Sequence, residues 1–270
     1  MKFERIPLSS EDESVYMDAY IADRVGAYTR KALLVIPGGG YGNVCSEREG
    51  EPIAMAFMPH GYNAFVLHYT VGRKQPFPVQ LIEVARAIAH IKTNAETYNI
   101  DPEAVFVVGF SAGGHLAASA GVLWKLPEVQ AAVDMPYGQN KPTGVMLIYP
   151  VISAEYHSFS FNNLLCDDAP TKDMLDAVSI EKHVDGDSAP AFIMHTANDQ
   201  VVDVKNALSI AWGYADAGVP HELHVYPDAP HGAALGNDIT ECGVAKWNNP
   251  AIAQWVNHAV AWANALAVEK

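Results

Sequence analysis

The chain has 270 residues, of which half are hydrophobic and 18% are charged, a composition typical of a globular protein with one large core. Its net charge of −14 at pH 7 argues against a nucleic-acid partner, because phosphate binding requires clustered lysines and arginines. No run of about 18 apolar residues occurs, so we expect no membrane partner either.

The amino-terminal segment lacks the apolar stretch of a secretory signal, and residues 15–20 suggest antiparallel strands at the leading edge of a sheet. Three scattered cysteines, Cys45, Cys166 and Cys242, form no CxxC pair. This spacing favours reduced thiols over a disulfide framework or a zinc site. We therefore expect a cytoplasmic protein, and no metal or cofactor is implied.

From residue 31 onward, short apolar runs alternate with segments of helical periodicity. The runs that predict β-strands cover residues 31–36, 63–69, 104–108, 144–149, 191–195 and 222–226. The segments that predict helices cover residues 79–98, 204–217 and 252–268. Most of the strands are apolar without alternation, as expected when helices cover both faces of a sheet. This order predicts an α/β fold with a mostly parallel, doubly wound sheet.

Two segments, residues 126–142 and 153–189, interrupt the alternation. Both are rich in Asp, Asn, Pro and Gly and weakly periodic, and connections of that length are uncommon unless they are functional. We expect both to pass over the carboxyl ends of the strands, where open α/β sheets bind ligands. With no repeat and no linker, residues 1–270 are expected to form one domain.

The strand at 104–108 leads into Gly109-Phe110-Ser111-Ala112-Gly113, a G-x-S-x-G pattern followed by a helix of small residues. In a nucleophile elbow the serine occupies a strained turn between strand and helix, and the glycines let the flanking chains approach. Ser111 is therefore the predicted nucleophile. A glycine-rich turn that opens a packed helix remains the alternative.

The strand at 31–36 ends in a glycine-rich loop, Pro37-Gly38-Gly39-Gly40-Tyr41-Gly42. Bare backbone at this position can approach a tetrahedral intermediate and donate hydrogen bonds to its oxyanion. We expect the N–H groups of Gly39, Gly40 and Ala112 to form this oxyanion hole. The loop matches neither a dinucleotide-binding motif nor a Walker phosphate-binding motif. A plain flexible turn without a catalytic role remains the alternative interpretation.

The predicted base is His231, which lies in a loop between the last strand and the last helix. The predicted acid is Asp199, because it lies just past the carboxyl end of the strand at 191–195 and precedes His231, as the triad order of hydrolases requires. Asp203 competes with it, but a position directly before the helix at 204 is explained by helix capping. Asp185 and Asp187 precede the strand and lie at its wrong end. His195, at the strand end, has an ordinary structural explanation.

With these motifs, the chain resembles bacterial α/β-hydrolase esterases of the acetyl-esterase and hormone-sensitive-lipase-like group, and looks most like the small intracellular sugar or xylan acetyl esterases. The residues that carry the resemblance are 37–41 (PGGGY), 48–52 (REGEP), 109–116 (GFSAGGHL), 195–199 (HTAND) and 230–232 (PHG). Pro37 replaces the first histidine of the lipase-like HGGG motif, and Asp203 stands where the family often has proline. Neither departure touches the triad.

The resemblance implies a serine carboxylesterase that hydrolyses short-chain, acetyl esters of sugars or xylo-oligosaccharides. Tyr41 is a candidate substrate-binding residue, since Tyr41, Tyr149 and Trp124 could offer either a stacking surface or core packing. Two further possibilities remain at this point, namely a reactive thiol at Cys45 and assembly into a homo-oligomer. The alternatives are another serine hydrolase, such as an aryl-formamidase or peptidase, and a non-catalytic binding protein on the same scaffold.

Overall fold

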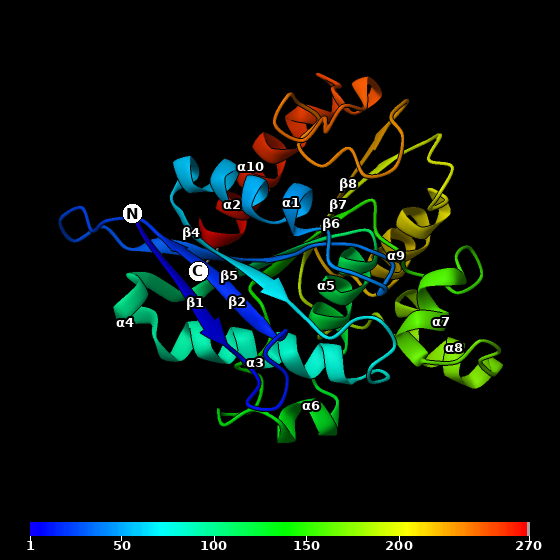
Figure 1. Ribbon diagram of the computed structural model, residues 1–270, viewed down its shortest axis with the longest axis horizontal. Coiled ribbons are helices and arrows are strands. Elements are labelled where there is room, and N and C mark those ends of the chain that lie inside the picture. Colours follow the sequence, from blue (N-terminus) through cyan, green and yellow to red (C-terminus); the bar gives the residue numbers. More distant parts are fainter. Residues whose placement is uncertain (269–270) are drawn as a thin grey trace.

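The computed structural model describes residues 1–268, and its centre is one eight-stranded sheet with the order β1-β2-β4-β3-β5-β6-β7-β8 (Figure 1). The strands are β1 (Lys2–Pro7), β2 (Tyr16–Ile21), β3 (Arg30–Ile36), β4 (Tyr62–His68), β5 (Ile100–Phe110), β6 (Gly144–Ile148), β7 (Ala191–Thr196) and β8 (His221–Tyr226). β2 pairs antiparallel with both β1 and β4, and the other pairs are parallel. The mostly parallel sheet and its antiparallel leading edge are therefore confirmed.

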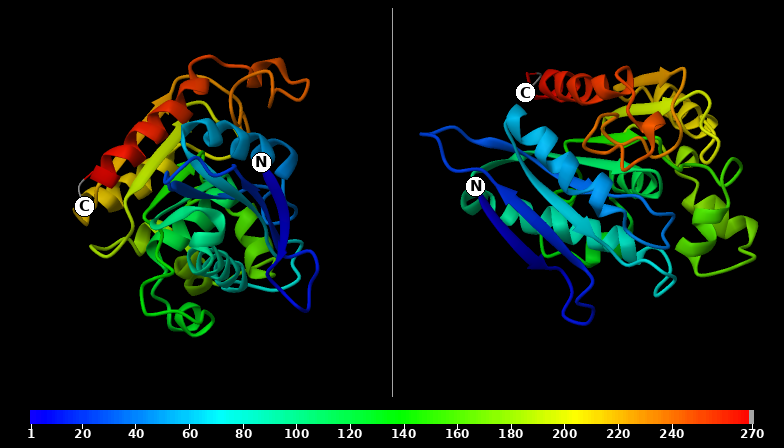
Figure 2. Two further views of the ribbon diagram at one scale, coloured as in Figure 1. Left: turned by 90° about the vertical axis from the view of Figure 1, so that its left-hand side faces the viewer. Right: turned by 45° about the horizontal axis from the view of Figure 1, so that its top comes forward.

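Helices cover both faces of this sheet (Figure 2). One apolar core joins the sheet to α3 (Val79–Thr93), α5 (Ala112–Val122) and α9 (Lys205–Asp216). A second core joins the opposite face to α2 (Glu51–Phe57) and α10 (Trp255–Val268). With both faces covered, successive residues of a central strand alternate between two dry cores, which explains the continuous apolar runs in the sequence.

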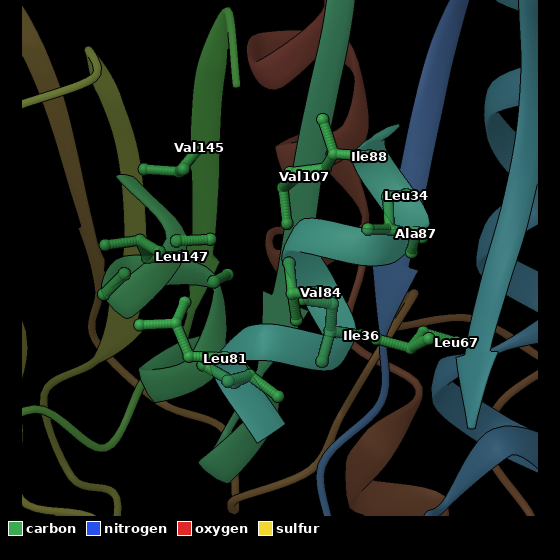
Figure 3. Packing of buried hydrophobic residues seen from close by; sticks show 14 of the residues in the cluster. Leu34, Ile36, Leu67, Leu81, Val84, Ala87, Ile88, Val107, Val145 and Leu147 are labelled. Atoms are coloured by element: carbon green, nitrogen blue, oxygen red, sulfur yellow. The ribbon is translucent and has the colours of Figure 1, made fainter. Parts of the chain in front are cut away.

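The packing of α3 shows how the sheet is held (Figure 3). Leu81, Val84 and Ile88 recur at helical spacing and are fully or almost fully buried against the sheet. They belong to one buried cluster with side chains that β3, β4, β5 and β6 present on this face, namely Leu34, Ile36, Leu67, Val107, Val145 and Leu147. This packing fixes the strands, and with them the loops that follow their carboxyl ends.

Two predicted helices are divided in the structure. The segment 79–98 splits at Asn94, whose side-chain amide donates to the carbonyl of His90, and α4 (Ala95–Tyr98) follows. The segment 252–268 begins as a 3-10 turn, η4 (Ile252–Gln254), before α10. The remaining elements are α1 (Ser46–Glu49), η1 (Met58–His60), α6 (Pro127–Ala131), α7 (Phe159–Leu165), α8 (Lys172–Val178), η2 (Ile180–Lys182) and η3 (Ala245–Trp247).

The expectation that residues 126–142 pass over the carboxyl ends of the strands is wrong. α5 returns the chain from the carboxyl end of β5 to the amino end, so the connection into the parallel strand β6 must begin there. Thr143 accordingly donates its N–H to the carbonyl of Val105, near the start of the buried part of β5. In Figure 1, α6 lies below α3, away from α7 and α8 at the other end of the sheet. Of the two interrupting segments, the first part of 153–189 is the one that reaches the carboxyl ends.

Candidate active site

Ser111 lies at the turn between β5 and α5, with φ 53° and ψ −119°. This left-handed backbone is costly for a residue with a side chain, and the flanking glycines make the turn fit. A Cβ on Gly109 would overlap the carbonyl of Gly113, and a Cβ on Gly113 would overlap the carbonyl of Ile36. The strained turn presents the Ser111 hydroxyl at the carboxyl edge of the sheet.

Two loops bring His231 and Asp199 to this hydroxyl. His231 follows β8, and its Nε2 lies 2.8 Å from Ser111 Oγ. Asp199 follows β7, and its Oδ2 lies 2.7 Å from His231 Nδ1. The structure thus joins the three predicted triad residues in one line of hydrogen bonds.

The acceptor chemistry of Asp199 fixes the protons along this line. An ionised carboxylate only accepts, so His231 Nδ1 carries a proton and its Nε2 offers a lone pair to the Ser111 hydroxyl. The other carboxylate oxygen, Oδ1, accepts from the backbone N–H groups of Val201 and Val202 at 2.8 and 3.0 Å. Burial alone would raise the pKa of Asp199, but hydrogen bonds from His195 and His231 outweigh it and hold this pKa well below its usual range.

His195 has a closer link to the site than its strand-end position predicted. Its Nε2 donates to the carbonyl of Val202 at 2.9 Å and lies 3.5 Å from Asp199 Oδ2. The side chains of His195 and Asp199 are both fully buried. Four residues separate them in the sequence, but this spacing brings side chains together only on a helix. His195 lies on β7 and Asp199 in the loop after it, so the sequence carried no signal for the contact.

The competing aspartates take structural roles. Asp203 Oδ1 accepts from the backbone N–H of Lys205 at 2.9 Å. The N-cap residue of α9 is Val204, without a side-chain cap, so Asp203 lies one residue before the cap position and forms a local turn contact there. Asp185 pairs with Lys125, which follows α5 at the amino end of the sheet.

The predicted oxyanion loop lies beside Ser111. Gly39 and Gly40 line the same cavity as Ser111 and His231, with φ values of 128° and 61° that favour glycine. The loop is anchored by its carbonyl groups: that of Gly39 accepts from Asn43 N–H at 3.2 Å, and that of Gly40 from Asn163 Nδ2 at 2.9 Å. Within residues 1–268, the N–H groups of Gly39, Gly40 and Ala112 have no hydrogen-bond acceptor and are free for a ligand.

Tyr41 does not reach the substrate cavity, which corrects the expectation of a substrate-binding role. Its side chain is buried, and its hydroxyl donates to His115 Nδ1 at 2.7 Å. His115 Nε2 in turn donates to the carbonyl of Val178 at 2.7 Å, and burial lowers the pKa of His115 to about 4. Tyr41 therefore stabilises the oxyanion loop from the protein core and does not contact the substrate. Tyr149 and Trp124, the other stacking candidates, are also buried.

Glu49, to which sequence reasoning gave no role, is a buried carboxylate between the oxyanion loop and the base loop. Its Oε2 accepts from Gly38 N–H and its Oε1 from the Tyr149 hydroxyl, both at 2.9 Å. The neighbouring Arg48 guanidinium lies 3.3 Å from Oε1 and stacks on Trp247, whose indole N–H donates to the carbonyl of His231. Both residues belong to segment 48–52, one of the motifs that carry the family resemblance, but the motif by itself did not indicate these buried contacts.

The cavity at Ser111 has a volume of about 220 Å³. Its walls include seven further residues that the sequence did not assign to the substrate, namely Arg48, Glu49, His157, Phe159, Ser160, Val201 and Val202. Cys45 also lines it, and burial raises the pKa of its thiol, which disfavours the reactive thiolate. Among the described residues, no cluster of three His, Cys, Asp or Glu side chains could hold a metal ion, and none of the described helices is long and apolar enough to cross a membrane.

Comparison with known protein families gives a match to the BD-FAE family over residues 17–212. Endo-1,4-beta-xylanase B of Butyrivibrio fibrisolvens is 38% identical over 219 residues, which are 77% of this chain and 33% of that protein. An acetylxylan esterase of Xylanibacter ruminicola is 27% identical over 235 residues, 84% of this chain and 45% of that protein. The chain thus spans between a third and a half of the length of these relatives.

Solved structures match over nearly the whole chain. An acetyl ester-xyloside bifunctional hydrolase from Caldicellulosiruptor lactoaceticus superposes with a TM-score of 0.83 at 29% identity, covering 98% of this chain and 96% of that one. A carboxylesterase from Lactobacillus plantarum superposes with a TM-score of 0.86 at 26% identity, covering 99% and 98%. These neighbours have the predicted fold.

Proposed function

The chain belongs to the BD-FAE family of α/β-hydrolases, and from this membership we propose that it is a serine carboxylesterase that hydrolyses acetyl esters of sugars or xylo-oligosaccharides. The observation that carries the proposal is the hydrogen-bonded line from Asp199 through His231 to Ser111, which ends in a cavity lined by the glycine loop. A small ester is the proposed partner. A cytoplasmic location is part of the proposal and is supported by the spacing of the three cysteines.

Each proposed catalytic residue has a chemical task that its contacts suit. His231 Nε2 takes the proton from Ser111 Oγ as this oxygen attacks the ester carbonyl, and later gives the proton to the leaving alcohol. Asp199 holds the imidazole in the tautomer that this transfer needs and stabilises the imidazolium. Water then attacks the acyl-enzyme by the same route, which releases the acid and restores Ser111.

The tetrahedral intermediates need donors where the negative charge develops. We assign this role to the N–H groups of Gly39, Gly40 and Ala112, because Gly39 and Gly40 line the cavity and Ala112 directly follows Ser111. None of the three N–H groups has an acceptor within the described chain. Ala112 is also the first residue of α5, so the positive end of the helix dipole faces the same point.

The cavity volume of about 220 Å³ supports a short acyl group, since pockets for drug-sized ligands span roughly 300–1,000 Å³. The acetylated sugar as the alcohol part is proposed from the similarity to the acetylxylan esterase and the acetyl ester-xyloside hydrolase.

The test is a hydrolysis panel of acetylated xylo-oligosaccharides, p-nitrophenyl esters from acetyl to palmitoyl, and N-formylkynurenine, run beside the Ser111→Ala variant. We expect acetate release to dominate and the variant to lose about 10⁶-fold in turnover. A wild-type protein that a fluorophosphonate probe does not label, or a variant with near-native hydrolysis, would refute the triad. Preferred cleavage of N-formylkynurenine would show that the protein is a formamidase and not an esterase.

A further inference from the structure

Two apolar side chains at the mouth of the Ser111 cavity are exposed to solvent. Phe159, the first residue of α7, is 67% exposed, and Val201, in the loop that carries Asp199, is 62% exposed. Both line the cavity. Exposed apolar side chains that gather at a pocket commonly mark a ligand surface.

The ring of Phe159 is held next to the oxyanion loop. Its Cε1 atom lies 3.3 Å from the position that a Cβ on Gly40 would take, so the ring edge contacts the loop. Asn163, one helical turn further along α7, donates its side-chain N–H to the carbonyl of Gly40 at 2.9 Å. α7, which lies beyond the carboxyl ends of the strands in Figure 1, is thereby fixed to the loop, and the ring has a defined place beside the reacting ester.

A polar pair stands on the same wall. His157 Nε2 and Ser160 Oγ are 2.8 Å apart, and both residues line the cavity. Ser160 Oγ lies 3.7 Å from the Cβ position of Gly40, so this pair too borders the oxyanion loop. Burial lowers the pKa of His157, so its ring is neutral at pH 7 and can exchange hydrogen bonds with hydroxyl groups.

An aromatic face beside a polar pair matches a ligand with an apolar face and a hydroxylated edge, which describes a pyranose ring. The solvent-exposed mouth suits the alcohol part of the ester, because that part must extend outward when the sugar belongs to an oligomer. The part of the cavity next to Ser111 and the glycine loop is then left for the acyl group.

We propose that Phe159 and the His157–Ser160 pair form the subsite that binds the sugar ring of an acetylated sugar ester. This proposal rests on the proposed esterase function. It assigns the alcohol side of the site to α7 and the residues before it, in place of the buried tyrosines.

The experiment compares two acetate esters, acetylated xylobiose and ethyl acetate, with acetate release as the common readout. Ethyl acetate has no ring to stack, so the ratio of the two kcat/KM values reports the subsite alone. In Phe159→Ala we expect this ratio to fall about two- to tenfold, mainly through a higher KM for acetylated xylobiose. Phe159→Tyr keeps an aromatic face and should retain the ratio. Trp212→Ala removes an aromatic side chain that is 72% exposed on α9 and does not line the cavity, so it should leave the ratio unchanged.

The outcomes separate the subsite from the esterase function. A Phe159→Ala variant with an unchanged ratio, or with equal losses on both esters, overturns the subsite while the esterase stands. A wild-type enzyme that hydrolyses ethyl acetate but not acetylated xylobiose also overturns the sugar subsite and leaves the esterase function standing. A wild-type protein that releases acetate from neither ester, and that a fluorophosphonate does not label, overturns the proposed function and the subsite with it.

Discussion

The hydroxyl of Tyr149 donates to Glu49 Oε1 at 2.9 Å, while the ring of Tyr149 packs against the imidazole of His231 with 5.0 Å between the ring centroids. The same carboxylate accepts the N–H of Gly38 in the oxyanion loop. Glu49 therefore connects the two loops that the proposed mechanism uses, although it lies in neither of them.

Replacing Glu49 by Gln should lower kcat. A carboxylate accepts from Gly38 and Tyr149 with one oxygen each, whereas the amide of Gln must turn its N–H₂ group toward one of these donors. An unsatisfied buried donor costs about 1–3 kcal/mol, and here it would displace a loop next to the reacting atoms. We expect kcat for p-nitrophenyl acetate to fall about tenfold or more with KM within about twofold.

The matched control is Glu47→Gln, an exposed glutamate in the same short helix α1. It should keep wild-type kinetics. If Glu49→Gln lowered the thermal unfolding temperature but left kcat intact, Glu49 would be a structural residue with no part in positioning the site.

The sequence predicted the strands well because a strand between two layers of helices must be apolar along its whole length. It also located Ser111, Asp199 and His231, because each lies in a loop directly after a strand and parallel strands end at the same edge. Residues 126–142 were misplaced because composition marks a loop without saying at which edge it lies.

The residues that the sequence missed depend on tertiary contacts. A glutamate next to an arginine in a polar segment is typical of a solvated surface, and only the folded chain shows that Gly38 and Tyr149 surround Glu49. Tyr41 was a candidate for the substrate because an aromatic ring in the glycine-rich loop could offer a stacking surface, with core packing as the alternative. The positive φ of 58° at this residue accompanies a side chain that is buried against His115 instead.

Asp199→Asn should keep the fold of the site and lose nearly all activity. The amide of Asn can donate to His231 Nδ1, which stabilises the tautomer whose Nε2 already carries a proton and cannot accept from Ser111. In a serine protease the equivalent change costs about 10⁴-fold in kcat, and we expect a loss of similar size here. Steady-state kinetics at pH 7, with circular dichroism to show an intact fold, is the measurement. Activity within tenfold of wild type would argue that a different carboxylate serves His231.

The stability of the protein in acid should depend on the same residue. The pKa of Asp199 is lower in the fold than the value of about 3.9 expected in an unfolded chain, because hydrogen bonds from His195 and His231 outweigh its burial. A carboxylate with a depressed pKa stabilises the fold fully above the unfolded pKa, and this stabilisation is lost as the pH falls toward the folded pKa.

Urea unfolding at pH 6 and pH 3 tests this dependence. The free energy of unfolding should fall more steeply between these values in the wild type than in Asp199→Asn, which has no proton to bind at this position. Other carboxylates with lowered pKa, such as Asp12, are present in both proteins and cancel in the comparison. Equal slopes for the two proteins would show that Asp199 does not contribute to acid sensitivity.

Gly113→Ala should disrupt the nucleophile elbow through sterics alone. A Cβ at this position would overlap the carbonyl oxygens of both Ile36 and Pro37, which are backbone atoms and cannot rotate away. Relief requires α5 to move from β3, at a cost of about 1–3 kcal/mol, and that movement shifts Ser111 and Ala112 away from the oxyanion loop. Gly186→Ala is the control, because a Cβ there meets no atom within 4 Å and Gly186 has no positive φ. We expect Gly113→Ala to lower both the unfolding temperature and kcat, and Gly186→Ala to change neither. If Gly113→Ala retained wild-type kcat, the close contact between α5 and the end of β3 would not be what sets the position of the nucleophile.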